Sequence, residues 1–171
     1  MKWKISKEAT RTIQTVDTGL DTGTGGRIRK LRNELDDEFM MTYGDGLSNV
    51  DLDGLLQHHR NLSKIATVTA FRPTPRFGSL EHSEGMVTRF SEKSSQNAGW
   101  INGGFLCLHK EVCGYIEDDS LSFESSPMDR MVRAKELAAF QHQGWRQRMD
   151  TFRDKRRLEL IWQQGNAPWI R

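Results

Sequence analysis

Two apolar runs with a helical stretch between them constrain the fold of this chain most strongly. Residues 39–43 (FMMTY) and 65–71 (IATVTAF) are short and apolar, and residues 50–56 open a helix with Asn49 or Asp51 as its predicted N-cap. Apolar runs of this length are typical of strands that are covered on both faces of a sheet. Because strands alternate with helices, the sequence predicts an α/β fold.

Turn signals and hydrophobic spacing predict the remaining elements. After Pro73 and Pro75 the sequence alternates apolar and polar residues with glycines at the turns, which is typical of antiparallel strands, so a mixed sheet is expected. No domain boundary is evident, and residues 1–171 are expected to form a single domain. The other predicted strands are residues 13–16, 76–93 and 100–112, and the other predicted helices are residues 28–35, 127–137 and 151–164.

Composition excludes several classes of protein. The chain has 171 residues and a formal net charge of +2, which is too small to indicate a nucleic acid or an anionic membrane as a partner. No apolar run approaches the roughly 20 residues of a membrane span, and no apolar segment of a secretory signal follows the basic N-terminus. Cys107 and Cys113 are too few for a disulfide framework or a zinc site, so we expect free thiols in a reducing cytoplasm.

The first candidate for chemistry is Asp45, which stands between Gly44 and Gly46 directly after a predicted strand. Ligands of open α/β sheets bind beyond the carboxyl ends of the strands. An aspartate at that position can hold a hard cation through oxygen, and flanking glycines let a ligand approach the backbone. The same residues are ordinary turn formers, so a tight turn is the alternative.

Asp150 is a second isolated acid, placed just before the helix predicted at residues 151–164. It could be the N-cap of that helix, a role that aspartate fills well. Two acids far apart in sequence, each at the end of an element, are also what a shared Mg²⁺ site needs, because that ion is held by one or two carboxylates together with substrate phosphates. We therefore expect the carboxylates of Asp45 and Asp150 to converge on one cation position.

A glycine-rich corner is a candidate for binding an anion. Gly25, Gly26 and Arg27 follow Thr22 and Thr24 at the start of a predicted helix. Hydroxyls, free backbone N–H groups and an arginine at such a place suit a phosphate. Glycine loops before helices are also common without any ligand, so the signal is weak by itself.

Four polar or small residues at or near strand ends are further candidates: Glu92, Lys93, Asn102 and Gly103. Glutamate can accept hydrogen bonds from sugar hydroxyls, lysine can neutralise a phosphate, and asparagine can both donate and accept. For each of these residues the alternative is a surface turn.

Taken in order, these motifs resemble the sugar-nucleotide pyrophosphorylases, a family of nucleotidyltransferases, and among them the glucose-1-phosphate cytidylyltransferases. The resemblance covers nearly all of residues 12–171 and is carried by the run VDTG…TGGRI…TYGDG…RFG…EK…INGGF…MDT.RDK…APW. It implies a Rossmann-like mixed sheet of the nucleotidyltransferase type. It also implies a reaction in which CTP and glucose 1-phosphate give CDP-glucose and pyrophosphate, with Mg²⁺ as the cofactor.

The resemblance implies roles for individual residues. The implied catalytic residues are Asp45, Asp150 and Lys93, of which the two aspartates would be the Mg²⁺ ligands. The implied nucleotide-binding residues are Thr22, Arg27 and Gly44. The implied sugar-binding residues are Glu92, Lys93, Asn102 and Gly103, with the lysine meeting the sugar phosphate.

The sequence also departs from this family. It has neither the glycine-rich GGxGTR loop that wraps the triphosphate nor the lysine of a KPM-type segment. The family's EKP motif reads Glu92-Lys93-Ser94 here, and Arg148 stands where the family often has proline. We therefore expect an N-terminally truncated sheet with an exposed edge, and an enzyme that needs oligomerisation or a separate N-terminal chain. The alternative is a non-catalytic remnant that binds sugar phosphate or a partner subunit.

Overall fold

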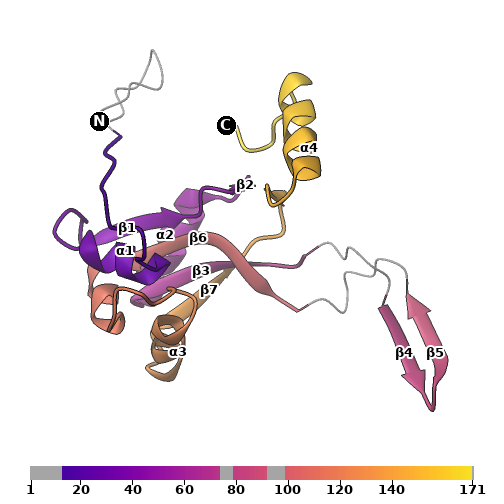
Figure 1. Cartoon of the computed structure of the whole chain (residues 1–171), viewed down its shortest axis with the longest axis horizontal. Helices are drawn as coiled ribbons and strands as arrows, with labels where there is room; N and C mark the ends of the chain where they lie inside the picture. The colour runs from indigo at the N-terminus through magenta and orange to yellow at the C-terminus, as the bar shows by residue number, and fades with distance from the viewer. Residues whose placement is uncertain (1–12, 74–78, 92–98, 171) are drawn as a thin grey trace.

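A four-stranded sheet forms the centre of the protein (Figure 1), in a computed structural model that describes residues 13–73, 79–91 and 99–170. In chain order, the described elements are α1 (Thr24–Lys30), β1 (Glu38–Thr42), β2 (Gly46–Ser48), α2 (Leu52–Leu62), β3 (Ala66–Phe71), β4 (Ser79–Ser83), β5 (Met86–Ser91), β6 (Ile101–His109), the 3-10 helix η2 (Lys110–Tyr115), α3 (Ser126–Arg133), β7 (Leu137–Gln141), β8 (Arg146–Arg148) and α4 (Phe152–Gln163).

The central sheet has the strand order β1-β6-β3-β7 and is mixed. Strand β6 runs antiparallel to both β1 and β3, and β3 runs parallel to β7. Strands β1, β3 and β7 therefore point the same way, and their carboxyl ends lie at one edge of the sheet, which is where ligands of open α/β sheets bind. The strands predicted at residues 39–43 and 65–71 are confirmed, as is the mixed sheet. The strand predicted at residues 100–112 is confirmed as far as His109, after which residues 110–112 begin η2.

The two faces of the sheet are covered by different helices, as the alternation of side chains along β6 requires. Leu106 and Leu108 are buried on one face, in a cluster with Phe123 and Met131 that also includes residues of α1 and η2. On the other face lies α2, whose buried His59 Nδ1 is 2.8 Å from Thr67 Oγ1 of β3. The sheet is thus an internal layer, which explains why its strands are almost continuously apolar.

Two smaller two-stranded sheets accompany the central one, β2 with β8 and β4 with β5. The β4–β5 hairpin confirms the antiparallel strands predicted in residues 76–93. The short β2–β8 pair was not predicted, because β2 and β8 have three residues each and only their mutual pairing makes them strands.

Two sequence expectations are wrong in detail. Residues 13–16 form no strand and pair with no strand of the described chain, and Val16 is largely exposed. The helix predicted at residues 127–137 ends at Arg133 in α3, and Leu137 instead begins β7. The apolar residues at the start of β7 are compatible with a continuing helix, so only pairing with β3 distinguishes the two.

A search of the helices in the described ranges finds none that is both long and apolar enough to cross a membrane. Both cysteines are free and buried, as expected. Burial raises the pKa of the Cys107 thiol to about 11 and also raises the pKa of Cys113, so neither thiol is a reactive thiolate at neutral pH.

We predict that the purified chain associates through β1. Within the described residues this edge strand pairs with β6 alone, and open N–H and C=O groups along an edge are a template for another strand. Multi-angle light scattering at increasing concentration should give a mass above the 19.7 kDa of one chain.

Replacing the partly exposed Met40 of β1 with lysine should reduce this association, because a charge on an edge strand opposes pairing. The matched control is Leu160→Lys on α4, an exposed apolar residue of a helix. A stable monomer at every concentration would contradict the exposed-edge expectation.

Candidate active site

Asp45 lies in the turn between β1 and β2, at the carboxyl edge of the central sheet. A Cβ atom added at Gly44 or at Gly46 would meet no described atom within 4 Å. The backbone on both sides of the Asp45 carboxylate is therefore open to a bulky group, as the sequence predicted.

Asp150 also lies near this turn, and the pairing of β8 with β2 positions it there. It follows β8, which pairs antiparallel with β2 in a register that sets Arg148 opposite Gly46. One step farther along the chain, the Met149 N–H donates to the Asp45 carbonyl oxygen over 2.8 Å. The β2–β8 pairing thus carries the end of β8 back to the turn that holds Asp45.

One guanidinium contacts both carboxylates. The Nη2 atom of Arg148 is 3.3 Å from Oδ2 of Asp45, and its Nε atom is 3.4 Å from Oδ1 of Asp150. All three side chains are partly exposed, from 38% for Asp150 to 51% for Arg148. The structure therefore brings the two predicted acids together around a positive charge, which the protein itself supplies.

Asp150 does not cap α4, which was the alternative role for it. The N-cap is Thr151, whose side chain accepts from the Asp154 N–H, while the Asp154 carboxylate accepts from the Thr151 N–H. This reciprocal capping box provides hydrogen-bond acceptors for the backbone N–H groups of Thr151 and Asp154, so the start of α4 needs no contribution from Asp150. The Asp150 carboxylate is thereby left to its contact with Arg148.

Arg146 provides a second positive charge beside the acids, in a half-buried and rigid position. Its guanidinium carbon lies 4.1 Å from the centre of the Phe71 ring, and its Nε–H donates to the Gly103 carbonyl oxygen over 2.7 Å. Burial lowers the pKa of Arg146, and Arg148 lowers it further, while Asp45 and Asp150 act in the opposite direction. An arginine remains charged at neutral pH despite such a shift, so Arg146 is a fixed cation.

The double glycine of β6 lets Thr69 and Tyr43 pack directly against the strand, beside Arg146. A Cβ at Gly103 would overlap Oγ1 of Thr69, and Gly104 has φ +81° and faces the Tyr43 ring. The Asn102 side chain accepts a hydrogen bond of 2.8 Å from the Gly104 N–H and so stabilises this irregular backbone. Asn102 and Gly103, which were predicted to line a sugar pocket, therefore shape the strand end next to Tyr43 and Arg146.

Thr22 and Arg27, the predicted nucleotide contacts, lie around the start of α1. The Thr22 hydroxyl is buried and donates to the Thr18 carbonyl oxygen, and Arg27 donates to the Thr18 hydroxyl. The side chain of Lys30 donates to the Thr22 hydroxyl over 3.1 Å. Both predicted residues thus hold the segment that precedes the helix, and Arg27 remains exposed.

The glycines of the same corner have a packing role. A Cβ at Gly23 would overlap the carbonyl oxygen of Leu121, and a Cβ at Gly26 would overlap that of Asp119. The N–H of Gly23 also donates to Asp119 over 2.8 Å. These contacts allow α1 to lie directly on the segment around residue 120.

A hydrogen-bond chain links this corner to the strand that leads to Asp45. The Thr24 hydroxyl lies 3.1 Å from Oε2 of Glu124, and the other carboxylate oxygen of Glu124 accepts from the Tyr43 hydroxyl. Tyr43 is two residues before Asp45. These hydrogen bonds place the start of α1 near the turn that holds Asp45, although the two are separated by β1 in the sequence.

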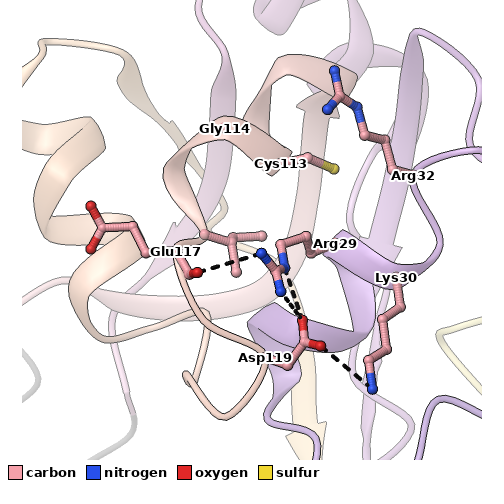
Figure 2. Close-up of a pocket in the computed structure, with 8 residues that line it drawn as sticks. Arg29, Lys30, Arg32, Cys113, Gly114, Glu117 and Asp119 are labelled. Carbon is pink, nitrogen blue, oxygen red and sulfur yellow. Dashed lines mark hydrogen bonds and ion pairs between the residues drawn. The ribbon is translucent and has the colours of Figure 1, made fainter.

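A pocket of about 540 Å³ lies beside the C-terminal end of α1 (Figure 2), lined in part by Arg29, Lys30, Arg32 and Asp119. Two of its three cations are already paired, since Asp119 is 2.7 Å from Arg29 and 3.6 Å from Lys30. Glu117 and Cys113 also line the pocket, and burial raises the pKa of the Cys113 thiol. The pocket holds none of the residues predicted to act in the site.

Glu92 and Lys93, predicted to meet the sugar and its phosphate, lie outside the described residues, and so do residues 76–78 of the RFG motif. Of the predicted site residues, the structure describes the two aspartates, the three nucleotide-binding candidates, Asn102 and Gly103. The structure brings Asp45 and Asp150 together and sets the corner that holds Thr22 and Arg27 near them through Glu124.

Sequence reasoning missed the two arginines of β8, although a signal for them exists. In the run RQRMD, the residues Arg146, Arg148 and Asp150 alternate with others at a spacing of two. In extended backbone this spacing puts all three on one face. Had residues 146–148 been predicted as a strand, the spacing would have predicted an arginine beside Asp150.

The donor set suits a divalent cation in its chemistry. Carboxylate oxygens are the ligands that Mg²⁺ takes from proteins, and two carboxylates already share one cationic partner here. Within the described ranges no group of three or more histidine, cysteine, aspartate or glutamate side chains could hold a metal. Mg²⁺ commonly completes its coordination with waters and substrate phosphates.

Comparison with solved structures defines the class of the fold, and no protein-family model matches the chain. A provisionally assigned glucose-1-phosphate thymidylyltransferase from Bacillus anthracis, solved in complex with a sucrose, superposes with a TM-score of 0.59 at 16% identity, over 88% of this chain and 63% of that one. The fold is therefore the mixed α/β fold of the nucleotidyltransferases, as predicted.

Sequence relatives narrow the class. The chain is 40% identical over 159 residues to the glucose-1-phosphate cytidylyltransferase of Salmonella typhi, which covers 92% of this chain and 62% of that protein. It is 36% identical over 167 residues to the probable glucose-1-phosphate cytidylyltransferase of Bacillus subtilis, covering 96% of this chain and 65% of that protein. The resemblance found in the sequence is confirmed, and the chain spans under two thirds of the length of these relatives.

We predict that Gly26→Ala destabilises the protein by about 1–3 kcal/mol, because the added methyl group would press on the Asp119 backbone, which no rotamer change can relieve. Gly114→Ala in η2 is the matched control, since a Cβ there meets no described atom within 4 Å. Urea unfolding followed by circular dichroism measures both. Equal midpoints for Gly26→Ala and the wild type would show that α1 does not depend on this close contact.

Proposed function

We propose that this chain takes part in the transfer of CMP from CTP to glucose 1-phosphate, which gives CDP-glucose and pyrophosphate. The observation that carries the proposal is the meeting of Asp45 and Asp150 at one guanidinium, beside a turn whose glycines leave the backbone open. The relatives named glucose-1-phosphate cytidylyltransferase support the choice of substrates. A reaction of CTP and a sugar phosphate belongs in the cytoplasm.

In this proposal Asp45 and Asp150 hold Mg²⁺, which when bound polarises the α-phosphate of CTP. Gly44 lies against the nucleotide, and Thr22 and Arg27 contact it from the start of α1. The support for this placement is the Thr24–Glu124–Tyr43 chain, which sets that helix next to the acid turn. Arg146, held against Phe71, adds a fixed positive charge near the phosphates.

The sugar side of the proposed site is formed by Glu92, Lys93, Asn102 and Gly103. Glu92 accepts from sugar hydroxyls, and Lys93 neutralises the phosphate of glucose 1-phosphate. Asn102 and Gly103 stand at the strand end that faces the acid turn across Tyr43 and Arg146, which is the support for their role.

The proposed chemistry is an in-line displacement at phosphorus. A phosphate oxygen of glucose 1-phosphate attacks the α-phosphorus of CTP and forms a new P–O bond. The bond from that phosphorus to the oxygen bridging to the β-phosphate breaks, and its electron pair leaves with pyrophosphate. Because the attacking oxygen is already anionic at neutral pH, the protein contributes positioning and charge neutralisation and needs no strong base.

We also propose that the reaction requires a second polypeptide along β1, either another copy of the chain or a separate N-terminal chain. The edge of β1 supports this part, since it borders the turn that holds Asp45 and pairs within the described residues on one side only. A strand added there would place its own loop next to the acid turn, where a triphosphate must be held.

The second candidate function is non-catalytic binding of a sugar phosphate. The observation that favours it is Arg148, which already neutralises both acids. The two candidates differ in what they require, because binding of glucose 1-phosphate alone needs no divalent cation, whereas binding of CTP at the acid turn does.

We predict that the isolated chain binds CTP in the presence of Mg²⁺ and loses this binding in EDTA, while pyrophosphate release with CTP and glucose 1-phosphate stays far below the rate of a normal enzyme. Calorimetry and a coupled pyrophosphate assay measure the two quantities. Binding of glucose 1-phosphate without any binding of CTP would favour the second candidate. Rapid pyrophosphate release by the chain alone would remove the need for a second polypeptide.

Replacing Asp45 or Asp150 with asparagine should weaken Mg²⁺-dependent CTP binding by about tenfold or more, because each change removes one charged ligand. The matched control is Asp53→Asn, an exposed acid in the first turn of α2. If Asp45→Asn binds CTP as well as the Asp53→Asn control, Asp45 is only a turn residue and the proposed site is wrong.

A further inference from the structure

Arg148 occupies the place that a bound cation would take at the acid pair. Two different nitrogen atoms of its guanidinium face two different carboxylates, with Nη2 at 3.3 Å from Asp45 and Nε at 3.4 Å from Asp150. A guanidinium is a planar fork whose nitrogens lie close together, so both acids point at one small region. The same region is the one where a shared divalent ion would have to bind.

Electrostatic repulsion opposes the binding of a divalent cation to Asp45 and Asp150 while Arg148 lies between them. Two carboxylates near one another repel, and a positive charge between them removes that repulsion. Arg146, which lies nearby and is pinned by Phe71 and Gly103, already adds one positive charge. An ion that entered while Arg148 stayed in place would therefore face two arginines, and its binding would be weakened.

The two arginines differ in their freedom to move. Arg146 is half-buried and held by a ring contact and a backbone hydrogen bond. The Arg148 side chain is 51% exposed and forms ion pairs with Asp45 and Asp150. Exposed ion pairs of this kind are worth at most about 1 kcal/mol each, so Arg148 can leave.

We propose that Arg148 is the resident counter-ion of the acid pair and that a divalent cation binds to Asp45 and Asp150 only by displacing it. Arg148 thereby lowers the affinity of the chain for a free divalent cation. Once displaced, the guanidinium is free to bind an incoming phosphate, which suits its fork geometry. This inference rests on the proposed function in one respect, namely that the two acids hold a divalent ion.

The experiment measures binding of Mn²⁺ alone, by the loss of the free-ion signal in electron paramagnetic resonance as protein is added. Arg148→Gln should bind Mn²⁺ about tenfold more tightly than the wild type, because one competing positive charge is removed next to the site. Arg148→Lys, which keeps the charge, should bind more weakly than Arg148→Gln. The matched control is Arg156→Gln, an exposed arginine of α4 that pairs with neither acid in the described structure.

A second measurement does not depend on the spectroscopy. Without Arg148 the two acids repel, so Arg148→Gln should melt at a lower temperature than the wild type and should regain that loss when Mn²⁺ is added. The wild type and Arg156→Gln should show a much smaller shift with Mn²⁺. Circular dichroism at both stages also shows that each variant is folded.

The outcomes separate this inference from the proposed function. Tighter Mn²⁺ binding by Arg148→Gln that is abolished by the further change Asp45→Asn supports both. If wild type and Arg148→Gln bind equally tightly and Asp45→Asn abolishes the binding, the metal site stands and the role of Arg148 is wrong. If neither protein binds Mn²⁺, the acid pair is not a metal site, and both ideas are overturned.

Discussion

Backbone pairing of β6 with β1 on one side and β3 on the other is the interaction on which the rest of this structure depends. Because β6 is antiparallel to both, β1 and β3 must run in the same direction, and β7 joins them in parallel with β3. Three carboxyl ends are thereby gathered at one edge of the sheet (Figure 1). One of them continues into the turn of Asp45, and another leads through β8 to Asp150.

The same strand shapes the site through its glycines. At the start of β6, Gly103 and Gly104 remove the side chains that would otherwise collide with Thr69 and Tyr43. Beside them, the Gly103 carbonyl oxygen accepts a hydrogen bond from the Nε–H of Arg146. Strand β6 therefore contributes to both the core and the site: its later residues Leu106 and Leu108 are buried in the core, and its earlier glycines border the site.

Charge balance in the site is achieved by the protein itself. Asp45 and Asp150 are opposed by Arg148 between them and by Arg146 close by, so the cluster carries no large net charge before any ligand arrives. This balance differs from that of a bare acid pair, which would either bind an ion or retain a proton. Arg148 stands at a position where the family that the sequence resembles often has proline, and a proline could not supply this counter-ion.

The sequence by itself indicated three of the four strands of the central sheet and the two acids of the candidate site, because apolar runs and an aspartate between glycines are local signals. It also indicated that Asp45 and Asp150 would meet, because two isolated acids at the ends of elements are what a shared Mg²⁺ site needs. It did not indicate β7, which only its pairing with β3 distinguishes from a continuing helix. It did not determine β8, a polar segment that is a strand only because it pairs with β2.

The tertiary structure alone decided what surrounds the two acids. Register between β2 and β8 sets Arg148 against both carboxylates, and the close contact of α1 with residues near Asp119 gives Gly26 a packing role where the sequence had indicated an anion site. Both outcomes depend on hydrogen bonds and steric contacts between segments about a hundred positions apart. Neither segment shows in its own sequence which segment it contacts, and the alternation of Arg146, Arg148 and Asp150 becomes informative only once β8 is known to be extended.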